Sequence, residues 1–201
     1  MENAVAVIGD LVGSRTAGDR AWVQEQLLSA LQIANAEVDA RQPLAPTIGD
    51  EFQAVYATVE DALAATLLVR LALPAPLDAR FGLGAGDLEI VGATAYGLTQ
   101  DGPAWWAARE AVDHVEQRAG RVPGARTWIE GEPMTVAYAL CRDQVVTALD
   151  DRQRRIALGL VRGHTQRQIA EDEAITPSAV SQHVRGAGIA ALVAAAQELR
   201  R

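Results

Sequence analysis

The order in which strand-like and helix-like stretches follow one another constrains the fold of this chain most. Short apolar runs, typical of buried strands, alternate with longer stretches in which apolar residues recur at helical spacing. Asp19 precedes the first helical stretch, and Pro74 ends the second. The predicted strands are residues 3–9, 45–49, 51–57 and 79–86, and the predicted helices are residues 18–40 and 60–73.

This order of elements is that of a ferredoxin-like split βαβ unit. A helix over about 104–119, a short strand near 126–130 and a helix over 133–148 would complete the same layer. The glycines of residues 79–86 weaken that strand, but they allow another backbone or a ligand to approach closely. We therefore predict an α+β fold with a ferredoxin-like palm over residues 1–148.

From Leu149 onward the pattern contains helices only, which predicts a small all-α domain over residues 149–201. Thr165 and Thr176 each stand where a helix N-cap is expected, and Pro177 follows at the first helical position. The chain is long enough for one larger and one smaller domain.

Two short runs place an aspartate directly after glycine near the end of a predicted strand: Gly9-Asp10 and Gly49-Asp50. Carboxylates at the ends of neighbouring strands can hold a divalent metal ion, and metal held in this way can bind a triphosphate. Gly-Asp is also ordinary turn chemistry, so either run alone fits a plain turn. Both together, with a helical pattern between them, favour a metal site built from Asp10 and Asp50.

Charge is divided unevenly along the chain. Residues 151–201 hold 8 Arg and 5 acidic residues, whereas residues 1–150 hold 10 Arg and 21 acidic residues. This division indicates two functions, and because lysine is absent, any side chain that grips phosphate must be Arg. The only cysteine, Cys141, lies in an apolar helical pattern and is predicted to be buried. One cysteine and no membrane-length apolar run predict a cytoplasmic protein without membrane contact.

Residues 8–15 resemble the opening of class III nucleotidyl cyclases, and residues 48–53 resemble the Gly-Asp hairpins of those cyclases and of diguanylate cyclases. Residues 80–87 resemble a cyclase strand. The resemblance implies that Asp10 and Asp50 bind two Mg²⁺ (or Mn²⁺) ions together with a nucleoside triphosphate.

The same resemblance implies that the loop after the first strand cradles phosphates with backbone N–H groups at a helix start. Its residues are Leu11, Gly13 and Ser14. Arg15 could reach phosphate or pair with a nearby acid, and Glu51 could assist the metal or face solvent.

Residues 9–15, 49–53 and 101–111 together resemble the SatD family, over most of residues 4–115 and again over 149–195. Within residues 101–111, Asp101 and Arg109 resemble parts of a cyclase pattern and are candidate nucleotide contacts.

The chain departs from active cyclases at their Asp-x-x-Asn-x-x-x-Arg pattern. Asp101 is followed by Ala104 where Asn is expected, Arg109 falls one position late, and the purine-reading Lys is absent. Because electrostatic stabilisation is often the largest catalytic contribution, these departures favour nucleotide binding, or different chemistry, over cyclisation. Trp105 and Trp106 could stack a base or cover the helix–sheet seam.

Residues 151–190 resemble the helix-turn-helix of response regulators and of sigma-factor region four, whose third helix enters the DNA major groove. The predicted DNA contacts are Arg167, Thr176, Ser178, Ser181, Gln182 and Arg185, with Arg152, Arg155 and Arg162 as further phosphate contacts. A helical packing or dimerisation module without DNA binding is the alternative, because the tail's net charge is small.

These observations lead to one leading hypothesis and two alternatives. The first is a DNA-binding regulator that binds a nucleotide with Mg²⁺ and works as a homodimer. The second is an active nucleotidyl cyclase or nucleotidyltransferase whose tail is a tether. The third is an inactive scaffold that uses the fold for protein contacts.

Overall fold

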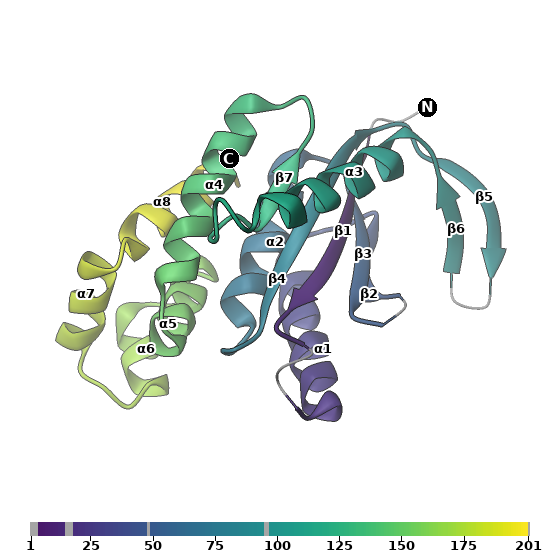
Figure 1. Ribbon diagram of the computed structural model, residues 1–201. Helices are drawn as coiled ribbons and strands as arrows, with labels where there is room; N and C mark the ends of the chain where they lie inside the picture. The colour runs from purple at the N-terminus through teal and green to yellow at the C-terminus, as the bar shows by residue number, and fades with distance from the viewer. Residues whose placement is uncertain (1–3, 15–17, 48, 95–96, 201) are drawn as a thin grey trace.

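The structure is a computed structural model that describes residues 4–14, 18–47, 49–94 and 97–200 (Figure 1). The first six elements follow the predicted order. They are β1 (Ala4–Val12), α1 (Arg20–Glu37), β2 (Gln42–Pro46), β3 (Glu51–Tyr56), α2 (Val59–Ala72) and β4 (Asp78–Gly86).

These elements form the sheet expected of a ferredoxin-like unit. The strand order is β2-β3-β1-β4, completed by β7 (Thr127–Ile129), which lies parallel to β4. Strand β1 is antiparallel to both β3 and β4, and its register sets Asp10 between Glu51 on β3 and Arg80 on β4. The α+β palm predicted from the order of elements is therefore confirmed.

Alternating residues of β1 face different helices. Val5 and Val7 pack in a large core cluster with α1 and α2, whereas Ile8 packs in a second cluster with α3 (Pro103–Arg118). Figure 1 shows α3 lying across the sheet on the face opposite α1 and α2. Because side chains two residues apart on a strand point to the same face, Asp10 lies on the α3 face with Ile8.

Glycine on β4 allows α3 to approach the sheet closely, as the sequence predicted. A Cβ on Gly84 would overlap the backbone of Ala104 and Ala108 in α3, and a Cβ on Gly82 would overlap the next turn of the same helix. Helix α3 therefore packs backbone against backbone on β4, and this contact sets its position above the end of β1.

We expect Gly84→Ala to lower the free energy of unfolding by about 3 kcal/mol, because a methyl group there would push α3 off the sheet. Urea denaturation of the purified protein measures this loss. Gly120→Ala is the matched control, since a Cβ at Gly120 meets nothing within 4 Å and the expected change is within about 0.5 kcal/mol. Equal stability of the two variants would show that α3 does not need the close approach.

Two features differ from the sequence prediction. A hairpin of β5 (Glu89–Thr94) and β6 (Gly97–Asp101) forms a separate two-stranded sheet at one end of the molecule (Figure 1). Its exposed Ile90 and Val91 give no clean alternation, so no strand signal stood out there. Cys141 is exposed on α4 (Pro133–Ala148), not buried as predicted, because it falls on the outer side of that helix.

The last four helices pack at the other end of the molecule (Figure 1). They are α5 (Asp151–Val161), α6 (Gln166–Asp172), α7 (Pro177–Gly186) and α8 (Ile189–Glu198). Their apolar residues belong to the same core cluster as α1 and α2. Whether residues 1–148 and 149–201 fold independently stays a prediction.

Polar contacts also join the tail to the palm. Arg162 forms an ion pair with Glu37 of α1, with an Nε–Oε1 distance of 2.8 Å. Arg154 donates to the carbonyl oxygen of Leu73, and Asp151 accepts the N–H of Ala75, so α5 holds the loop that follows α2. Within the described ranges, no helix combines the length and apolar character needed to cross a lipid bilayer.

Candidate functional site

The two predicted metal ligands lie at one end of the sheet, on adjoining strands. Asp10 is near the end of β1, and Asp50 directly precedes β3 in the turn with Gly49, whose φ of 73° favours glycine. The backbone N–H of Leu11 donates to the carbonyl oxygen of Asp50 at 3.3 Å, which ties the two segments together. The strand order that the sequence predicted thus brings residues 40 positions apart to one edge.

Asp10 is held by an arginine from the neighbouring strand. The Arg80 Nε donates to Asp10 Oδ2 at 2.8 Å, and the same guanidinium pairs with Glu116 of α3 at 3.1 Å. Burial raises the pKa of the Asp10 carboxyl above its ordinary value; the charge of Arg80 offsets part of that rise, and the charge of Asp50 adds to it. The influence of Asp50 shows that the two carboxylates repel each other, which a cation between them would relieve.

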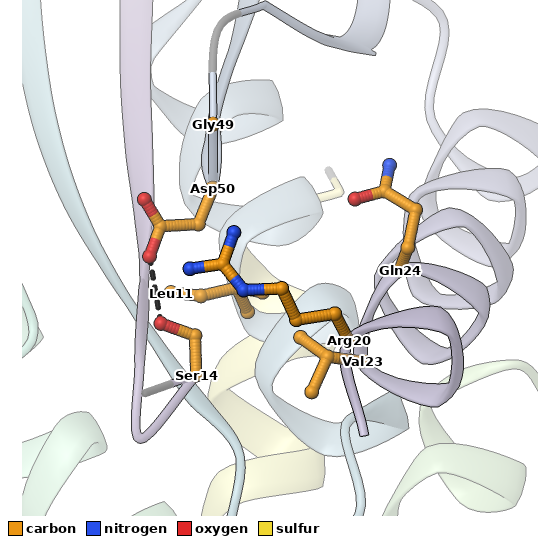
Figure 2. Close-up of a pocket in the computed structure, with 7 residues that line it drawn as sticks. All are labelled: Leu11, Ser14, Arg20, Val23, Gln24, Gly49 and Asp50. Carbon is orange, nitrogen blue, oxygen red and sulfur yellow. Dashed lines mark hydrogen bonds between the residues drawn. The ribbon is translucent and has the colours of Figure 1, made fainter. Parts of the chain in front are cut away.

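Asp50 is oriented by the loop after β1. The Ser14 hydroxyl donates to Asp50 Oδ2 at 2.7 Å, and Figure 2 shows this bond together with Arg20 and Gln24 of α1 on the opposite wall. In the described part of the chain, the second oxygen of Asp10 and of Asp50 has no hydrogen-bond donor. Among the described residues, one oxygen of each carboxylate is therefore positioned by a hydrogen bond and the other is not.

Two pockets meet at Asp50. The larger, of about 470 Å³, lies on the α3 face and is lined by Asp10, Gly13, Ser14, Asp50, Arg80 and Glu116 among others. The smaller, of about 300 Å³, lies on the α1 face and holds Arg20 and Gln24 (Figure 2). We call the larger one the carboxylate pocket.

The carboxylate pocket fits Mg²⁺ in the way that nucleotide-binding proteins hold it. Among the described residues, no group of three or more His, Cys, Asp or Glu side chains is gathered to enclose an ion. Mg²⁺ commonly takes only one or two carboxylates and completes its shell with water and substrate phosphates. Asp10 and Asp50 supply two carboxylates, so the donor set suits an ion that arrives with a phosphate ligand.

The predicted phosphate cradle differs from the observed loop in two respects. Leu11 belongs to β1, its side chain is buried in the core, and its N–H is already bonded to Asp50. Helix α1 begins only at Arg20, and the Asp19 carboxylate accepts the N–H groups of its first turn. Leu11, Gly13 and Ser14 all line the pocket, but no helix of the described chain starts there; Arg15 lies outside the described residues.

Glu51 and Arg109 are brought together, but as partners of each other. Arg109 donates to both carboxylate oxygens of Glu51, at 2.8 and 3.1 Å, which joins α3 to β3. Asp101 accepts the N–H of Gly102 and the indole N–H of Trp106, so it fixes the start of α3. None of these three predicted nucleotide contacts lines the carboxylate pocket, and Asp101 lies at the opposite end of α3 from Glu116.

A comparison with models of known protein families found a match to this chain. A family model described as the SatD family matches residues 4–123, which includes β1 to β6, α3 and both aspartates. The chain belongs to the SatD family. The match ends before the C-terminal helices, so the SatD resemblance of residues 149–195 stays a prediction.

Solved structures and curated proteins add little to the SatD assignment. The structure titled as the active GGEEF domain of a diguanylate cyclase from Vibrio cholerae is similar with 12% identity and a TM-score of 0.43, over 58% of this chain and 78% of that chain. A likeness at this level carries no argument about function. No curated protein matches the chain.

The predicted DNA contacts of this SatD-family chain lie around α7. Ser178, Gln182 and Arg185 are exposed and spaced by four and three residues, so they share one face of the helix. Thr176 caps α7 by accepting the N–H of Ala179. Arg185 also donates to Ser181, which is partly buried.

Four other arginines of the tail are paired with acids. Arg152 and Arg155 both pair with Glu173 in the turn between α6 and α7, Arg162 pairs with α1, and Arg167 lies 3.7 Å from Glu171. The positive charge available to a phosphate backbone is therefore smaller than the sequence count indicates.

Sequence reasoning missed Arg80 and Glu116 as members of the carboxylate pocket. Arg80 stood within the cyclase-like strand, but only the antiparallel register of β1 and β4 sets it opposite Asp10. Glu116 follows Arg109 by two helical turns, so both lie on the same side of α3, and this spacing was the available signal.

Proposed function

We propose that this SatD-family chain binds a nucleoside triphosphate with Mg²⁺ or Mn²⁺ in the carboxylate pocket, and that it acts as a nucleotide-responsive regulator in the cytoplasm. The observation that carries the proposal is the convergence of Asp10 and Asp50 in a pocket of about 470 Å³, where the described residues donate a hydrogen bond to only one oxygen of each carboxylate. A triphosphate would supply the remaining ligands that the two carboxylates do not.

The residues of the carboxylate pocket would have different roles in binding the metal and the phosphates. Asp10 and Asp50 would hold the metal, which screens the phosphate charge when bound. Ser14 would keep Asp50 oriented, and Arg80, whose guanidinium is shared between Asp10 and Glu116, would keep Asp10 in place.

We favour binding of the nucleotide without its cyclisation. Arg109 is paired with Glu51, and Ala104, which stands where cyclases carry Asn, is buried in the first turn of α3 against β4, so neither is available to stabilise developing charge. The alternative is an active nucleotidyl cyclase or nucleotidyltransferase that uses other groups.

One experiment separates these versions. The purified chain is titrated calorimetrically with each nucleoside triphosphate in Mg²⁺, in Mn²⁺ and in EDTA, and pyrophosphate is measured in the same samples. We expect metal-dependent binding without pyrophosphate release. Release of pyrophosphate would establish the enzyme, and absence of binding to every triphosphate with either metal would refute the nucleotide site.

We further propose that α6 and α7 form a helix-turn-helix that binds DNA as part of a homodimer. Support comes from the four-residue turn between the helices, where Ala174 has a φ of 53°, and from the exposed face of α7 with Ser178, Gln182 and Arg185. Two copies would set two such helices against two half-sites about 34 Å apart.

DNA affinity should fall as salt rises, because released counterions drive phosphate binding. Arg185→Ala should weaken binding and reduce the slope of log affinity against log salt by about 1. Arg121→Ala, an exposed arginine in the palm, is the charge-matched control. Fluorescence polarisation with random-sequence duplex measures both. No affinity even at low salt would exclude the DNA-binding proposal and leave a helical packing module.

A further inference from the structure

A second pocket of about 500 Å³ lies beside the carboxylate pocket on the α3 face of the sheet. Three glutamine side chains and two indoles line it: Gln42, Gln53, Gln100, Trp105 and Trp106. Ile8 of β1 and Arg109 and Glu110 of α3 complete the wall. We call it the indole pocket.

The two pockets are neighbours along the same strand. Ile8 lines the indole pocket and Asp10 lines the carboxylate pocket, so they are separated by two residues, or about 7 Å, on one face of β1. Gln53 is the register partner of Ile8, and Glu51 is the register partner of Asp10. The Glu51–Arg109 pair therefore stands at the boundary between the two pockets.

The indole pocket contains hydrogen-bonding groups without a partner. The described residues provide none for the buried indole N–H of Trp105 or for the buried Oε1 of Gln100. One is a donor and the other an acceptor, so a ligand edge that carries both an acceptor and a donor could satisfy them after a small side-chain rotation. Amide-like edges of this kind are found on nucleobases.

The charge and shape of the pocket favour an uncharged aromatic ring. The charge of Arg109 is neutralised by Glu51, and Glu110 adds a negative charge, so a phosphate group gains little there. The indole of Trp106 is 60% exposed, yet its N–H is fixed by Asp101 Oδ1 at 2.8 Å. An exposed indole held in one orientation is a stacking platform for a flat ring.

We propose that the indole pocket binds the base of the nucleotide whose phosphates lie in the carboxylate pocket. This inference rests on the proposed function. It extends that function by placing the base-binding site on the α3 face of the sheet, and not in the pocket on the α1 face that contains Arg20. The ligand class is a nucleoside: a neutral heteroaromatic ring with an amide-like edge, followed by a sugar that spans the Glu51–Arg109 boundary.

Calorimetry with separate parts of the ligand tests the inference on the full chain. The probes are Mg²⁺-tripolyphosphate, the four nucleosides, and the four nucleoside triphosphates with Mg²⁺. We expect at least one triphosphate to bind more tightly than tripolyphosphate by about tenfold or more. Trp106→Ala and Gln53→Ala should remove that difference and leave the affinity for Mg²⁺-tripolyphosphate unchanged.

Gln24→Ala, in the pocket on the α1 face, is the matched control for Gln53→Ala and should have no effect. Loss of base preference in Gln24→Ala but not in Trp106→Ala or Gln53→Ala would overturn the inference. Equal affinity for triphosphates and tripolyphosphate would also overturn it while leaving the proposed function intact. Binding of a nucleoside without any binding of Mg²⁺-tripolyphosphate would support the indole pocket and refute the metal site.

Discussion

Arg70→Ala is expected to lower the free energy of unfolding by about 3–5 kcal/mol, the largest loss of any single substitution proposed for this protein. The Arg70 side chain is fully buried in α2. Its guanidinium donates to both oxygens of Asp78 at 2.9 and 2.8 Å, to Asp143 Oδ1 at 3.1 Å and to the Thr147 hydroxyl at 2.9 Å. Truncation would leave two buried carboxylates short of a counter-charge and would open a cavity between α2, β4 and α4.

At acid pH, Arg70→Ala should lower the free energy of unfolding by less than it does at pH 7. Burial raises the pKa of Asp78, but the hydrogen bonds and charges of Arg70 and Arg126 outweigh burial, so its pKa in the folded chain lies below the ordinary value. Asp78 therefore adds stability above its unfolded pKa of about 4, and that stability is lost as the pH falls through the lower folded value. Without Arg70 the pKa of Asp78 in the folded chain rises, because only Arg126 and the backbone N–H of Ala79 then oppose burial, and part of the contribution to stability disappears.

Urea denaturation at pH 7 and at pH 4 measures both effects. The control is Arg121→Ala, which removes an exposed arginine and should change stability by no more than about 0.5 kcal/mol. A loss below about 1 kcal/mol in Arg70→Ala at pH 7 would mean that Arg126 and Arg142 suffice to neutralise the buried acids.

The elements of the fold were predictable where the signal is local. The caps of α5, α6 and α7 come from Asp150, Thr165 and Thr176, whose side chains accept N–H groups three residues ahead. Such contacts depend only on neighbours in the sequence, so residue type and spacing suffice to predict them. The same local patterns predicted the order of the strands. This order in turn predicted that Asp10 and Asp50 lie close together at one end of the sheet.

Contacts that depend on register or on distant segments were not predictable. Arg70 stands in an apolar helical run, and its partner Asp143 is 73 residues away, so no period links them. The pairs Asp10–Arg80 and Glu51–Arg109 require the exact offset between strands and the position of α3 over the sheet, which the glycines of β4 allow but do not specify. The convergence of Asp10 and Asp50 was thus predictable from the sequence, whereas the pairing of Asp10 with Arg80 was not, and the role of the two aspartates as metal ligands stays a prediction.

Asp50→Asn and Asp10→Asn are each expected to weaken metal-dependent triphosphate binding by about 100-fold or more, since each removes one of the two carboxylates available to the ion. Ser14→Ala should cost less, about tenfold, because it removes only the hydroxyl that orients Asp50. Asp39→Asn, an exposed acid outside the pocket, makes the same charge change and should bind as the wild type does.

The pH dependence of metal binding should reflect the environment of Asp10. Burial raises the pKa of Asp10, and the charge of Asp50 raises it further, so protons compete with metal at Asp10 at a higher pH than at an ordinary carboxyl. Affinity for Mg²⁺-tripolyphosphate in the wild type should therefore fall as the pH is lowered through this raised pKa. In Asp50→Asn the repulsion is gone, and the residual affinity should persist to lower pH.

Calorimetric titration from pH 7.5 to pH 5 measures these affinities, and thermal unfolding of each variant shows whether it remains folded. Wild-type affinity in both Asp10→Asn and Asp50→Asn, with folding intact, would contradict the metal site directly. The grading is the stronger test. A general effect of removing one negative charge would appear in Asp39→Asn as much as in the others, whereas coordination by Asp10 and Asp50 predicts two large losses, one intermediate loss at Ser14 and none at Asp39.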